Sequence, residues 1–231
     1  MPTTLITGAN KGIGLKLVER YAQAGHQVIA CCRNPEAATD LQALAEQTGK
    51  VQIEGVTVGD GTSVTALRQR VGDQPVDLLI NNAGMAGPAP DQQSAQAMDF
   101  EGWAETMNVN TMAPLRVLQA FRPNLAAAEH AKAVTITSQM GALSLNMPVM
   151  YAYCSSKAAV NKIMRMYATD AAQDGIAVQL IHPGWVQTDM GGAQAEITPE
   201  QSADGIVSVI DGLAMENTGS FMKWDGEVHD W

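Results

Sequence analysis

The sequence predicts a single α/β domain with a doubly wound, mostly parallel seven-stranded sheet and helices on both faces. Two observations lead to this fold class. Short apolar stretches typical of buried strands alternate with amphipathic helical stretches roughly seven times along the chain. Parallel strands joined by right-handed crossovers place helices on both faces of their sheet. The length of 231 residues suits one domain, and we expect 1–231 to fold as one unit.

The first half of the chain alternates strand and helix regularly. Residues 3–7 read as a buried strand that leads into a glycine cluster, and residues 13–24 carry apolar side chains at helical spacing. Asn34 and Pro35 are typical of the cap and first position of a helix, which ends near Gly49. The remaining elements are strands at 28–32, 51–58 and 76–80 and a helix at 64–71, opened by Asp60 as a cap.

The second half is less regular at its start. Residues 85–99 form a loop-rich segment, and residues 100–121 form a helix that Pro114 should kink or interrupt. Thr198 and Gln201 have the spacing of a capping box, with Pro199 at the first helical position, so a helix extends from there to about 213. The other elements are strands at 133–138, 176–181 and 219–224 and a long helix at 153–174.

Composition excludes several classes of protein. The chain has 46% hydrophobic residues, which is too apolar for a disordered protein. Its formal net charge of −10 argues against a protein that coats nucleic acid or an anionic membrane. No apolar run is long enough to cross a bilayer, and the first residues lack the pattern of a secretion signal. The 3 cysteines make no disulfide framework and no metal site is indicated, so we expect a cytoplasmic protein.

The glycine cluster stands where a nucleotide-binding loop is expected, between the first strand and the first helix. Glycines allow a tight turn, and the following helix offers free N–H groups and a partial positive charge to a pyrophosphate. The spacing is Gly-x-x-x-Gly-x-Gly rather than the common dinucleotide fingerprint, and a plain glycine-rich turn is the alternative. The residues of this loop that we expect to bind the cofactor are Gly8, Asn10, Lys11, Gly12, Ile13 and Gly14.

Two cations favour a phosphorylated ribose. The second strand ends without the acidic residue that would bind the ribose hydroxyls of NAD. Arg33 follows that strand instead, and together with Lys11 it could neutralise a 2′-phosphate. Two solvated surface cations are the alternative. The sequence therefore favours NADP(H) over NAD(H).

Further motifs follow the later strands in a fixed order. Asn81-Asn82-Ala83-Gly84 follows the fourth strand, Ser138 ends the fifth, and His182-Pro183-Gly184 follows the sixth. Asn110 and the segment Tyr153-Cys154-Ser155-Ser156-Lys157 complete the set. Together with the glycine loop, this set resembles the short-chain dehydrogenase/reductase family over essentially the whole chain. The length and the final segment resemble small carbonyl reductases and the bacterial C-factor-type proteins. The resemblance implies a Rossmann fold.

The resemblance also implies roles for four residues. Tyr153 would donate a proton to the alkoxide that forms when hydride attacks a carbonyl carbon. Lys157 lies one helical turn later, on the same face, and its ammonium should lower the pKa of Tyr153. In the family this lysine also bonds the nicotinamide ribose, so both residues count as cofactor-binding. Ser138 would orient the substrate oxygen, and Asn110 resembles the residue that holds a water behind the lysine.

Other positions are similar to cofactor-binding positions of the family. Asn82, Ala83 and Gly84 resemble the segment that lines the adenosine side. The loop after the sixth strand resembles the one that contacts the nicotinamide end, and its matching members are Pro183, Gly184, Val186 and Thr188. The family usually has an aspartate that bonds the adenine amino group. Thr57 stands at that place, beside Val58, whose backbone could still contact the adenine.

The resemblance therefore implies an NADPH-dependent reductase that converts a ketone or aldehyde to an alcohol. An apolar substrate is favoured by the residues expected to line it: Met85, Met140, Leu143, Leu145, Met147, Trp185 and Met190. An NADP(H)-binding signalling or regulatory protein and an NAD-linked secondary-alcohol dehydrogenase are the alternatives. Members of the family are usually homodimers or homotetramers built on two long helices, here near 100–121 and 153–174, whereas small carbonyl reductases can be monomers.

Overall fold

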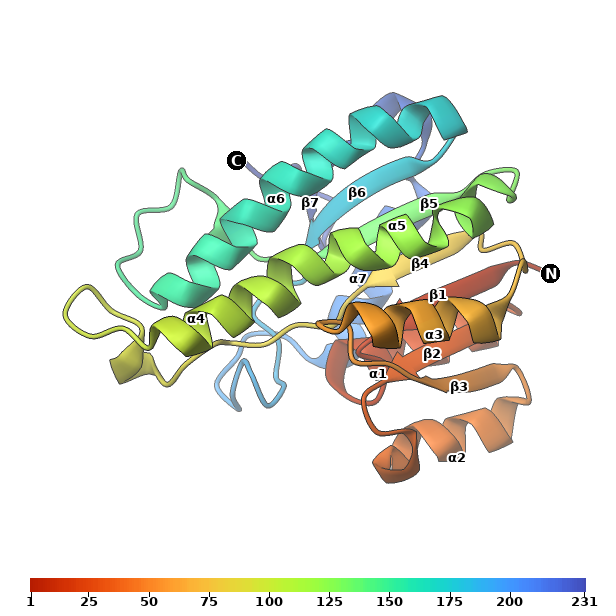
Figure 1. Ribbon diagram of the computed structural model, residues 1–231, viewed down its shortest axis with the longest axis horizontal. Helices are drawn as coiled ribbons and strands as arrows, with labels where there is room; N and C mark the ends of the chain where they lie inside the picture. The colour runs from red at the N-terminus through yellow and green to blue at the C-terminus, as the bar shows by residue number, and fades with distance from the viewer.

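A computed structural model describes residues 1–231 and contains one parallel sheet between two layers of helices (Figure 1). The 7 strands follow the order β3-β2-β1-β4-β5-β6-β7, and every neighbouring pair is parallel. They are β1 (Thr3–Thr7), β2 (Gln27–Cys32), β3 (Val51–Gly55), β4 (Leu78–Asn81), β5 (Lys132–Ile136), β6 (Ala177–His182) and β7 (Ser220–Lys223). The predicted fold class is confirmed, and the sheet is wholly rather than mostly parallel.

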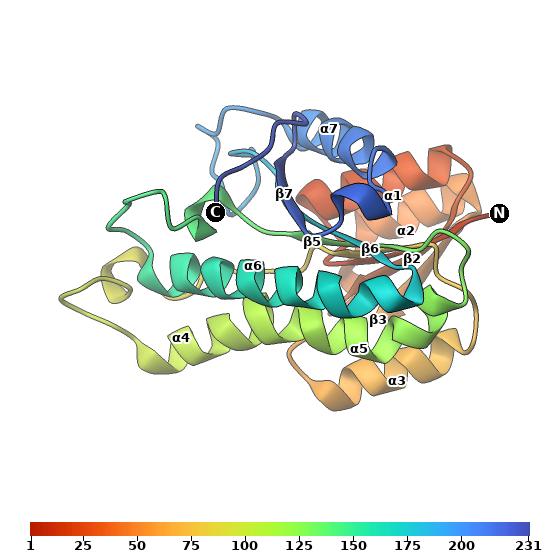
Figure 2. The ribbon, with the colours of Figure 1, turned by 90° about the horizontal axis from the view of Figure 1, so that it is seen from above.

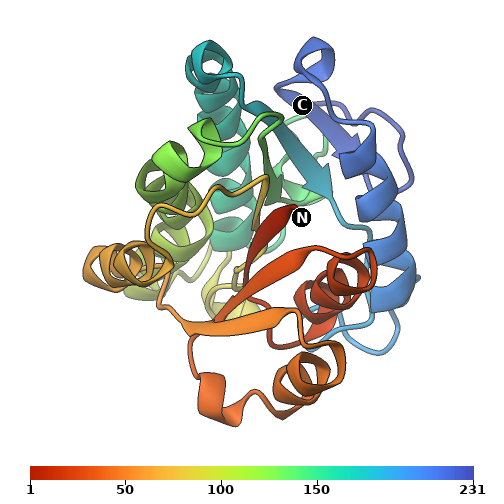
Figure 3. The same cartoon turned by 90° about the vertical axis from the view of Figure 1, so that its right-hand side faces the viewer.

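Helices cover both faces of the sheet, as Figures 2 and 3 show from two directions. One layer contains α1 (Gly12–Gln23), α2 (Thr39–Thr48) and α7 (Pro199–Asp211). The other contains α3 (Gly61–Val71), α5 (Ala113–Ala126) and α6 (Tyr151–Ala171), and α4 (Phe100–Met107) continues the line of α5 beyond the sheet. No helix combines the length and the apolar character that a membrane span requires.

Alternate strand residues enter separate hydrophobic cores. Leu5 packs into the core under α3, α5 and α6, whereas Ile6 packs into the core under α1 and α7. In the same way, Cys31 packs into the first of these cores and Cys32 into the second, and both are free thiols. Successive side chains of a strand point to opposite faces, so a sheet covered on both sides requires an uninterrupted apolar sequence in each strand.

The strand order reverses between β1 and β4. From β1 the chain proceeds outward through β2 and β3, and from β4 it proceeds in the other direction to β7. In open α/β sheets ligands bind at the carboxyl ends of the strands near such a point. The glycine loop follows β1 and Asn82–Gly84 follows β4, so both predicted cofactor segments lie there.

Two predicted elements are shorter than expected. The helix expected after Asn34 is divided into a 3-10 turn, Pro35–Ala37, and α2, because Ala38 between them has φ −89° and ψ 62°. The Asn34 side chain makes no capping hydrogen bond. The strand expected at 51–58 ends at Gly55, which pairs with Cys32 at the end of β2 and leaves later residues without a partner strand. The other strands begin and end within two residues of their predicted positions.

The helix expected at 100–121 is interrupted, as Pro114 predicted. It consists of α4, a π turn over Asn108–Met112, and α5, in which Pro114 occupies the first turn. The ring removes a backbone N–H at this place, so the regular hydrogen-bond pattern cannot pass through it. The long helix begins at Tyr151, earlier than predicted, and ends in a 3-10 turn over Ala172–Asp174. The capping box predicted at Thr198 is confirmed.

Candidate active site

The loop after β1 has the backbone geometry that only glycine adopts easily. Gly8 has φ +67° and Gly12 has φ +55°, both in the left-handed region. A Cβ atom at Gly14 would lie 2.2 Å from the carbonyl oxygen of Gly8, so no larger residue fits there. Lys11 precedes α1 without a capping side-chain hydrogen bond. The first N–H groups of α1 are therefore free to bind an anion such as a pyrophosphate.

The segment after β4 holds this loop in place. The side-chain amide of Asn82 donates hydrogen bonds to the carbonyl oxygens of Thr7 at 3.1 Å and Gly8 at 3.0 Å. The Thr7 hydroxyl oxygen accepts from the backbone N–H groups of Asn82 and Ala83, both at 3.1 Å. Thr7 was not among the predicted site residues. The sequence does indicate it, because a hydroxyl side chain at the last position of the first strand can hydrogen-bond the backbone of a loop that follows a neighbouring strand.

Asn110 is fully engaged with protein groups. It is 1% exposed, and its amide nitrogen donates to the carbonyl oxygen of Met85 at 2.8 Å and to the hydroxyl of Ser156 at 3.0 Å. Its amide oxygen accepts from the backbone N–H of Met85 at 2.9 Å. The π turn brings this side chain inward between the segment after β4 and α6. A Cβ atom on Gly84 would lie 3.3 Å from the Asn110 amide oxygen and 3.7 Å from the Lys157 ammonium.

Tyr153 and Lys157 are buried together on α6. Tyr153 is 9% and Lys157 6% exposed, and the Lys157 Nζ atom lies 5.7 Å from the centre of the Tyr153 ring. Nζ also donates to the carbonyl oxygen of Ile136, the last residue of β5, at 3.1 Å. These two residues therefore stand beside the carboxyl end of β5, where Ser138 was predicted to meet them.

The prediction that Lys157 lowers the pKa of Tyr153 is wrong in this structure. Burial raises the pKa of Tyr153, and the Ser138 side chain opposes this rise by hydrogen bonding. Burial also lowers the pKa of Lys157 to about 8. The ammonium lies over the ring rather than against the hydroxyl, so desolvation outweighs its attraction for a phenolate. Tyr153 is consequently protonated near neutral pH, as a proton donor must be.

Ser138 is held by the turn that follows it. Its hydroxyl oxygen accepts from the backbone N–H of Met140 at 3.1 Å, and the side chain is 7% exposed. A Cβ atom at Gly141 would lie 2.6 Å from the backbone carbon of Lys157, so this turn packs directly on α6. That contact explains how Ser138 comes beside Tyr153. Gly141 escaped the sequence prediction because its role depends on a helix that packs against it.

The loop after β6 meets the glycine loop. A Cβ atom on Gly12 would lie 3.1 Å from the methyl group of Thr188. The carbonyl oxygen of Pro183 accepts from the Ser202 hydroxyl at 2.6 Å, and Gly184 has φ +87°. Val186 is buried at 4% exposure. The sites predicted for the pyrophosphate and for the nicotinamide are therefore adjacent.

The two predicted phosphate-binding cations have different surroundings. Arg33 directly follows β2, is exposed, and makes no hydrogen bond or ion pair. The Lys11 ammonium pairs with Asp189 at 2.5 Å, although both side chains are largely exposed. Binding of a 2′-phosphate by Lys11 stays a prediction, and it requires the ammonium to leave Asp189. An exposed pair of this kind contributes little stability and exchanges readily.

Thr57 and Val58 lie in the loop after β3. The backbone N–H of Thr57 donates to the Ser63 hydroxyl at 2.9 Å, and the carbonyl oxygen of Val58 accepts from Arg116 at 2.8 Å. The predicted cap is confirmed, because Asp60 accepts from the backbone N–H of Thr62. Arg116 thus holds a segment predicted to contact the adenine.

Predicted site residues from distant parts of the chain converge on one edge of the sheet. Contacts connect the glycine loop to Ala83, Gly84 to Lys157, and Gly12 to Thr188. Arg33 and Thr57 follow neighbouring strands at the same edge. No group of three or more His, Cys, Asp or Glu side chains is placed to hold a metal ion.

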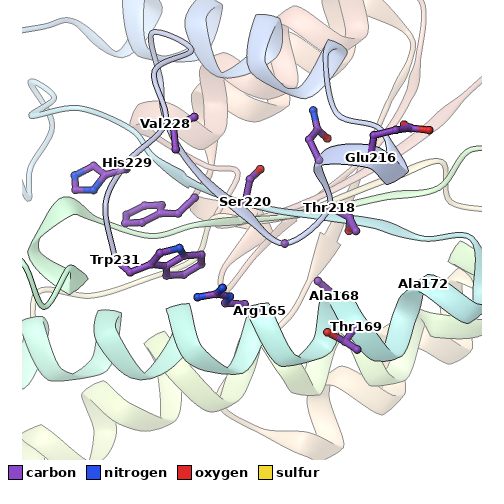
Figure 4. Close-up of a pocket in the computed structure, with 13 residues that line it drawn as sticks. Arg165, Ala168, Thr169, Ala172, Glu216, Thr218, Ser220, Val228, His229 and Trp231 are labelled. Atoms are coloured by element: carbon purple, nitrogen blue, oxygen red, sulfur yellow. The ribbon is translucent and has the colours of Figure 1, made fainter.

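Five of the seven predicted substrate-lining residues are exposed, whereas Met85 and Met140 are half-buried. Exposure is 87% for Leu143, 40% for Leu145, 45% for Met147, 47% for Trp185 and 50% for Met190. Contiguous exposed apolar side chains commonly mark a binding surface. A separate pocket of about 560 Å³ contains none of the predicted site residues. It lies between α6, β7 and the final segment, where Arg165 and Trp231 face each other (Figure 4).

The comparison with protein families decides the classification. The family profile described as short chain dehydrogenase matches residues 2–198. The chain belongs to this family. Among curated relatives, the C-signal protein of Myxococcus xanthus is 40% identical over 158 residues, which is 68% of this chain and 93% of that protein. A 1-hydroxy-2-glutathionyl-2-methyl-3-butene dehydrogenase of Rhodococcus sp. strain AD45 is 35% identical over 100% of both chains.

Among solved structures, this chain is similar to carbonyl reductases. The NADPH-bound carbonyl reductase from chicken fatty liver has a TM-score of 0.91 and 31% identity, with 100% of this chain and 99% of that chain covered. The predicted resemblance to short-chain dehydrogenases and small carbonyl reductases is confirmed. The protein is therefore an oxidoreductase of this family by sequence and by fold.

Proposed function

We propose that this protein is an NADPH-dependent reductase of apolar ketones or aldehydes, with Tyr153 as the proton donor. The observation that carries the proposal is the burial of Tyr153 and Lys157 side by side, next to Ser138. A phenol and an ammonium are rarely buried together without a function, since burial disfavours the charge of each.

The chain's own residues supply the proton and orient the substrate. When bound, the nicotinamide supplies a hydride to the carbonyl carbon. Tyr153 donates its hydroxyl proton to the carbonyl oxygen as negative charge develops there, and Lys157 stabilises the resulting phenolate. Ser138 donates a hydrogen bond to the same oxygen. Asn110 acts behind this group, where it holds the segment around Met85 against α6.

The phosphate groups of the cofactor fit the residues after β1 and β2. The glycine loop offers left-handed turns and uncapped N–H groups, which suit a pyrophosphate. Arg33 has no partner in the protein and would bind a 2′-phosphate, with Lys11 as a second cation once it leaves Asp189. The NADPH bound to the chicken carbonyl reductase supports the same choice here. NAD(H) is the less favoured cofactor.

A signalling role with little turnover is a second candidate. It is favoured by the identity of 40% with the C-signal protein. Both functions use the same cofactor site. They differ only in whether Tyr153 transfers a proton to the oxygen of a carbonyl substrate. NAD-linked oxidation of a secondary alcohol is a third candidate. The Rhodococcus relative is named a dehydrogenase, which favours alcohol oxidation as the direction of reaction. Arg33 opposes NAD as the cofactor.

Initial rates of NADPH and NADH consumption distinguish these functions. The substrates are a panel of apolar ketones, aldehydes and diketones, and Tyr153→Phe serves as the blank. We expect rapid loss of NADPH that disappears in the variant. Binding of NADPH without turnover on any substrate would instead favour the signalling function. Turnover only with NAD and secondary alcohols would favour the third candidate.

We also propose a homodimer or homotetramer formed through α4, α5 and α6, in the cytoplasm. Exposed apolar side chains on or beside these helices support it, since Phe100 is 70%, Met112 47% and Met166 60% exposed. Sedimentation equilibrium of the wild type and of Met166→Lys tests it. A monomeric wild type would contradict this assembly.

A further inference from the structure

The helix that carries Tyr153 has no N-terminal cap of its own. Met150 precedes α6, and its side chain makes no capping hydrogen bond. It has φ +48° and is the one non-glycine residue of the protein with a positive φ. The first N–H groups of a helix have no acceptor within the helix and need one elsewhere. Tyr153 lies in this first turn, so the proposed proton donor sits where a helix frays most readily.

Gln93 provides the missing acceptors. Its backbone carbonyl oxygen accepts from the N–H of Tyr151 at 3.1 Å, and its side-chain oxygen accepts from the N–H of Tyr153 at 3.3 Å. Gln93 is 1% exposed, so water does not compete for these groups. A residue 60 positions before Tyr153 therefore caps its helix.

The other end of the same side chain binds the segment after β4. The amide nitrogen of Gln93 donates to the carbonyl oxygens of Ala86 at 3.1 Å and Pro88 at 2.6 Å. The residue between them, Gly87, packs against α6, because a Cβ atom there would lie 3.5 Å from that of Ala152. Both functional groups of the Gln93 amide are thus used, one on each of two adjoining segments.

We propose that Gln93 is a positioning residue for the reduction, which caps α6 and thereby fixes Tyr153 beside Ser138. The inference rests on the proposed function, in which Tyr153 donates the proton. Without the side-chain oxygen of Gln93, the N–H of Tyr153 loses its acceptor and the first turn opens. The Tyr153 hydroxyl then moves relative to the carbonyl oxygen. Proton transfer depends steeply on this placement, whereas the glycine loop that binds the cofactor does not contact Gln93.

The variants Gln93→Met and Gln93→Glu distinguish the hydrogen bond that caps α6 from the packing of the Gln93 side chain. Methionine keeps the length of the side chain but removes both polar groups. Glutamate keeps an acceptor for the N–H of Tyr153. Because the site is buried beside the carbonyl oxygens of Ala86 and Pro88, the carboxyl group is expected to be protonated and to donate to one of them. Gln96→Met is the matched control, because Gln96 is exposed and its side chain makes no hydrogen bond. The measurements are kcat and KM for the best carbonyl substrate, the Kd for NADPH, and the melting temperature.

In Gln93→Met we expect kcat to fall about tenfold to a hundredfold, since misplacement by about 1 Å has effects of that size. The Kd for NADPH and the KM should stay near the wild-type values. Gln93→Glu should recover most of the lost kcat, and Gln96→Met should behave as wild type. Unchanged kcat in Gln93→Met, or equal loss in Gln93→Met and Gln93→Glu, overturns the proposal.

Hydrogen exchange of the wild-type protein tests the cap without any variant, even if Gln93→Met does not fold. The amides of Tyr151 and Tyr153 should exchange as slowly as those of the next turn of α6. Exchange at the rate of exposed loop amides overturns the cap. Neither outcome depends on turnover, so failure of this inference is distinguishable from failure of the proposed reductase function.

Discussion

The Nζ atom of Lys157 lies 5.7 Å from the centre of the Tyr153 ring, and both side chains are buried. They belong to successive turns of one helix, which explains their shared face. Their burial has opposite consequences for protonation. The phenol keeps its proton more firmly than in water, and the ammonium keeps its proton less firmly.

Replacing the tyrosine isolates the proton donor. Tyr153→Phe should lower kcat by at least about a hundredfold, since general acid catalysis contributes about 10²–10⁴. Binding of NADPH, measured by fluorescence titration, should remain within about twofold, because only a hydroxyl is removed. Tyr151→Phe is the matched control, since Tyr151 is 39% exposed and lies on another face of α6. Equal losses in both variants would contradict the assigned role.

Replacing the lysine should increase stability while it abolishes turnover. Burial lowers the pKa of Lys157 to about 8, so the unfolded chain binds this proton more tightly than the folded protein. The contribution is unfavourable below pH 8 and disappears as the pH rises from about 8 toward the unfolded value of 10.5. Lys157→Met should therefore raise the free energy of unfolding by about 1–3 kcal/mol at neutral pH.

Urea denaturation of cofactor-free protein at pH 7 and pH 10 measures this effect. The advantage of Lys157→Met over the wild type should be largest at the lower pH and should shrink at the higher pH. A variant that is less stable than the wild type by nearly the same amount at both pH values would show that the lysine is charged and favourably bonded in the folded protein throughout this range.

The choice of cofactor should depend on Arg33. Arg33→Gln removes the cation that has no partner in the protein, so kcat/KM for NADPH should fall about tenfold or more while that for NADH stays nearly constant. Lys162→Gln, an exposed change on α6 away from this loop, is the control. The ratio of the two kcat/KM values is the quantity to compare. An unchanged ratio would assign the 2′-phosphate to Lys11 or to no cation.

Removal of the Asn110 amide should affect the fold as well as the reaction. Asn110→Ala leaves both backbone groups of Met85 without their partner and removes one partner of the Ser156 hydroxyl. The Ser156 hydroxyl still donates to the carbonyl oxygen of Tyr153, so only the two groups of Met85 are left unpaired by the change. At about 1–3 kcal/mol for each, we expect a loss of about 2–6 kcal/mol in unfolding free energy. Asn146→Ala, at an exposed position, should have no measurable effect. Wild-type stability in Asn110→Ala would limit Asn110 to a role in proton transfer.

Much of the site could be predicted because its motifs follow strands. The order of strands and helices places Gly8, Asn82 and Pro183 at carboxyl ends of a parallel sheet, and parallel strands bring those ends together. The interruption near Pro114 was also predicted, since a proline removes a backbone donor. Pro123 lies inside α5 without ending it, so the effect of a proline depends on its surroundings as well.

The contacts of Gln93 and the pKa of Tyr153 could not be predicted in this way. Gln93 lies in a loop without periodicity, and its partners in α6 are 60 residues distant. The direction of the Tyr153 pKa depends on burial by several elements, whereas the sequence indicates only the nearby lysine. Such properties arise from packing between segments, which local patterns do not encode.

The π turn over Asn108–Met112 constrains how the length of this chain can change. A π turn holds one residue more than a regular helix over the same span, and each residue of an α-helix corresponds to a rotation of about 100°. Deletion of a single residue here would rotate α4 relative to α5 about their common axis by about 100°. The Trp103 indole would then leave the Ser155 hydroxyl, to which it now donates at 2.9 Å. Alignment gaps between relatives should therefore fall outside this turn.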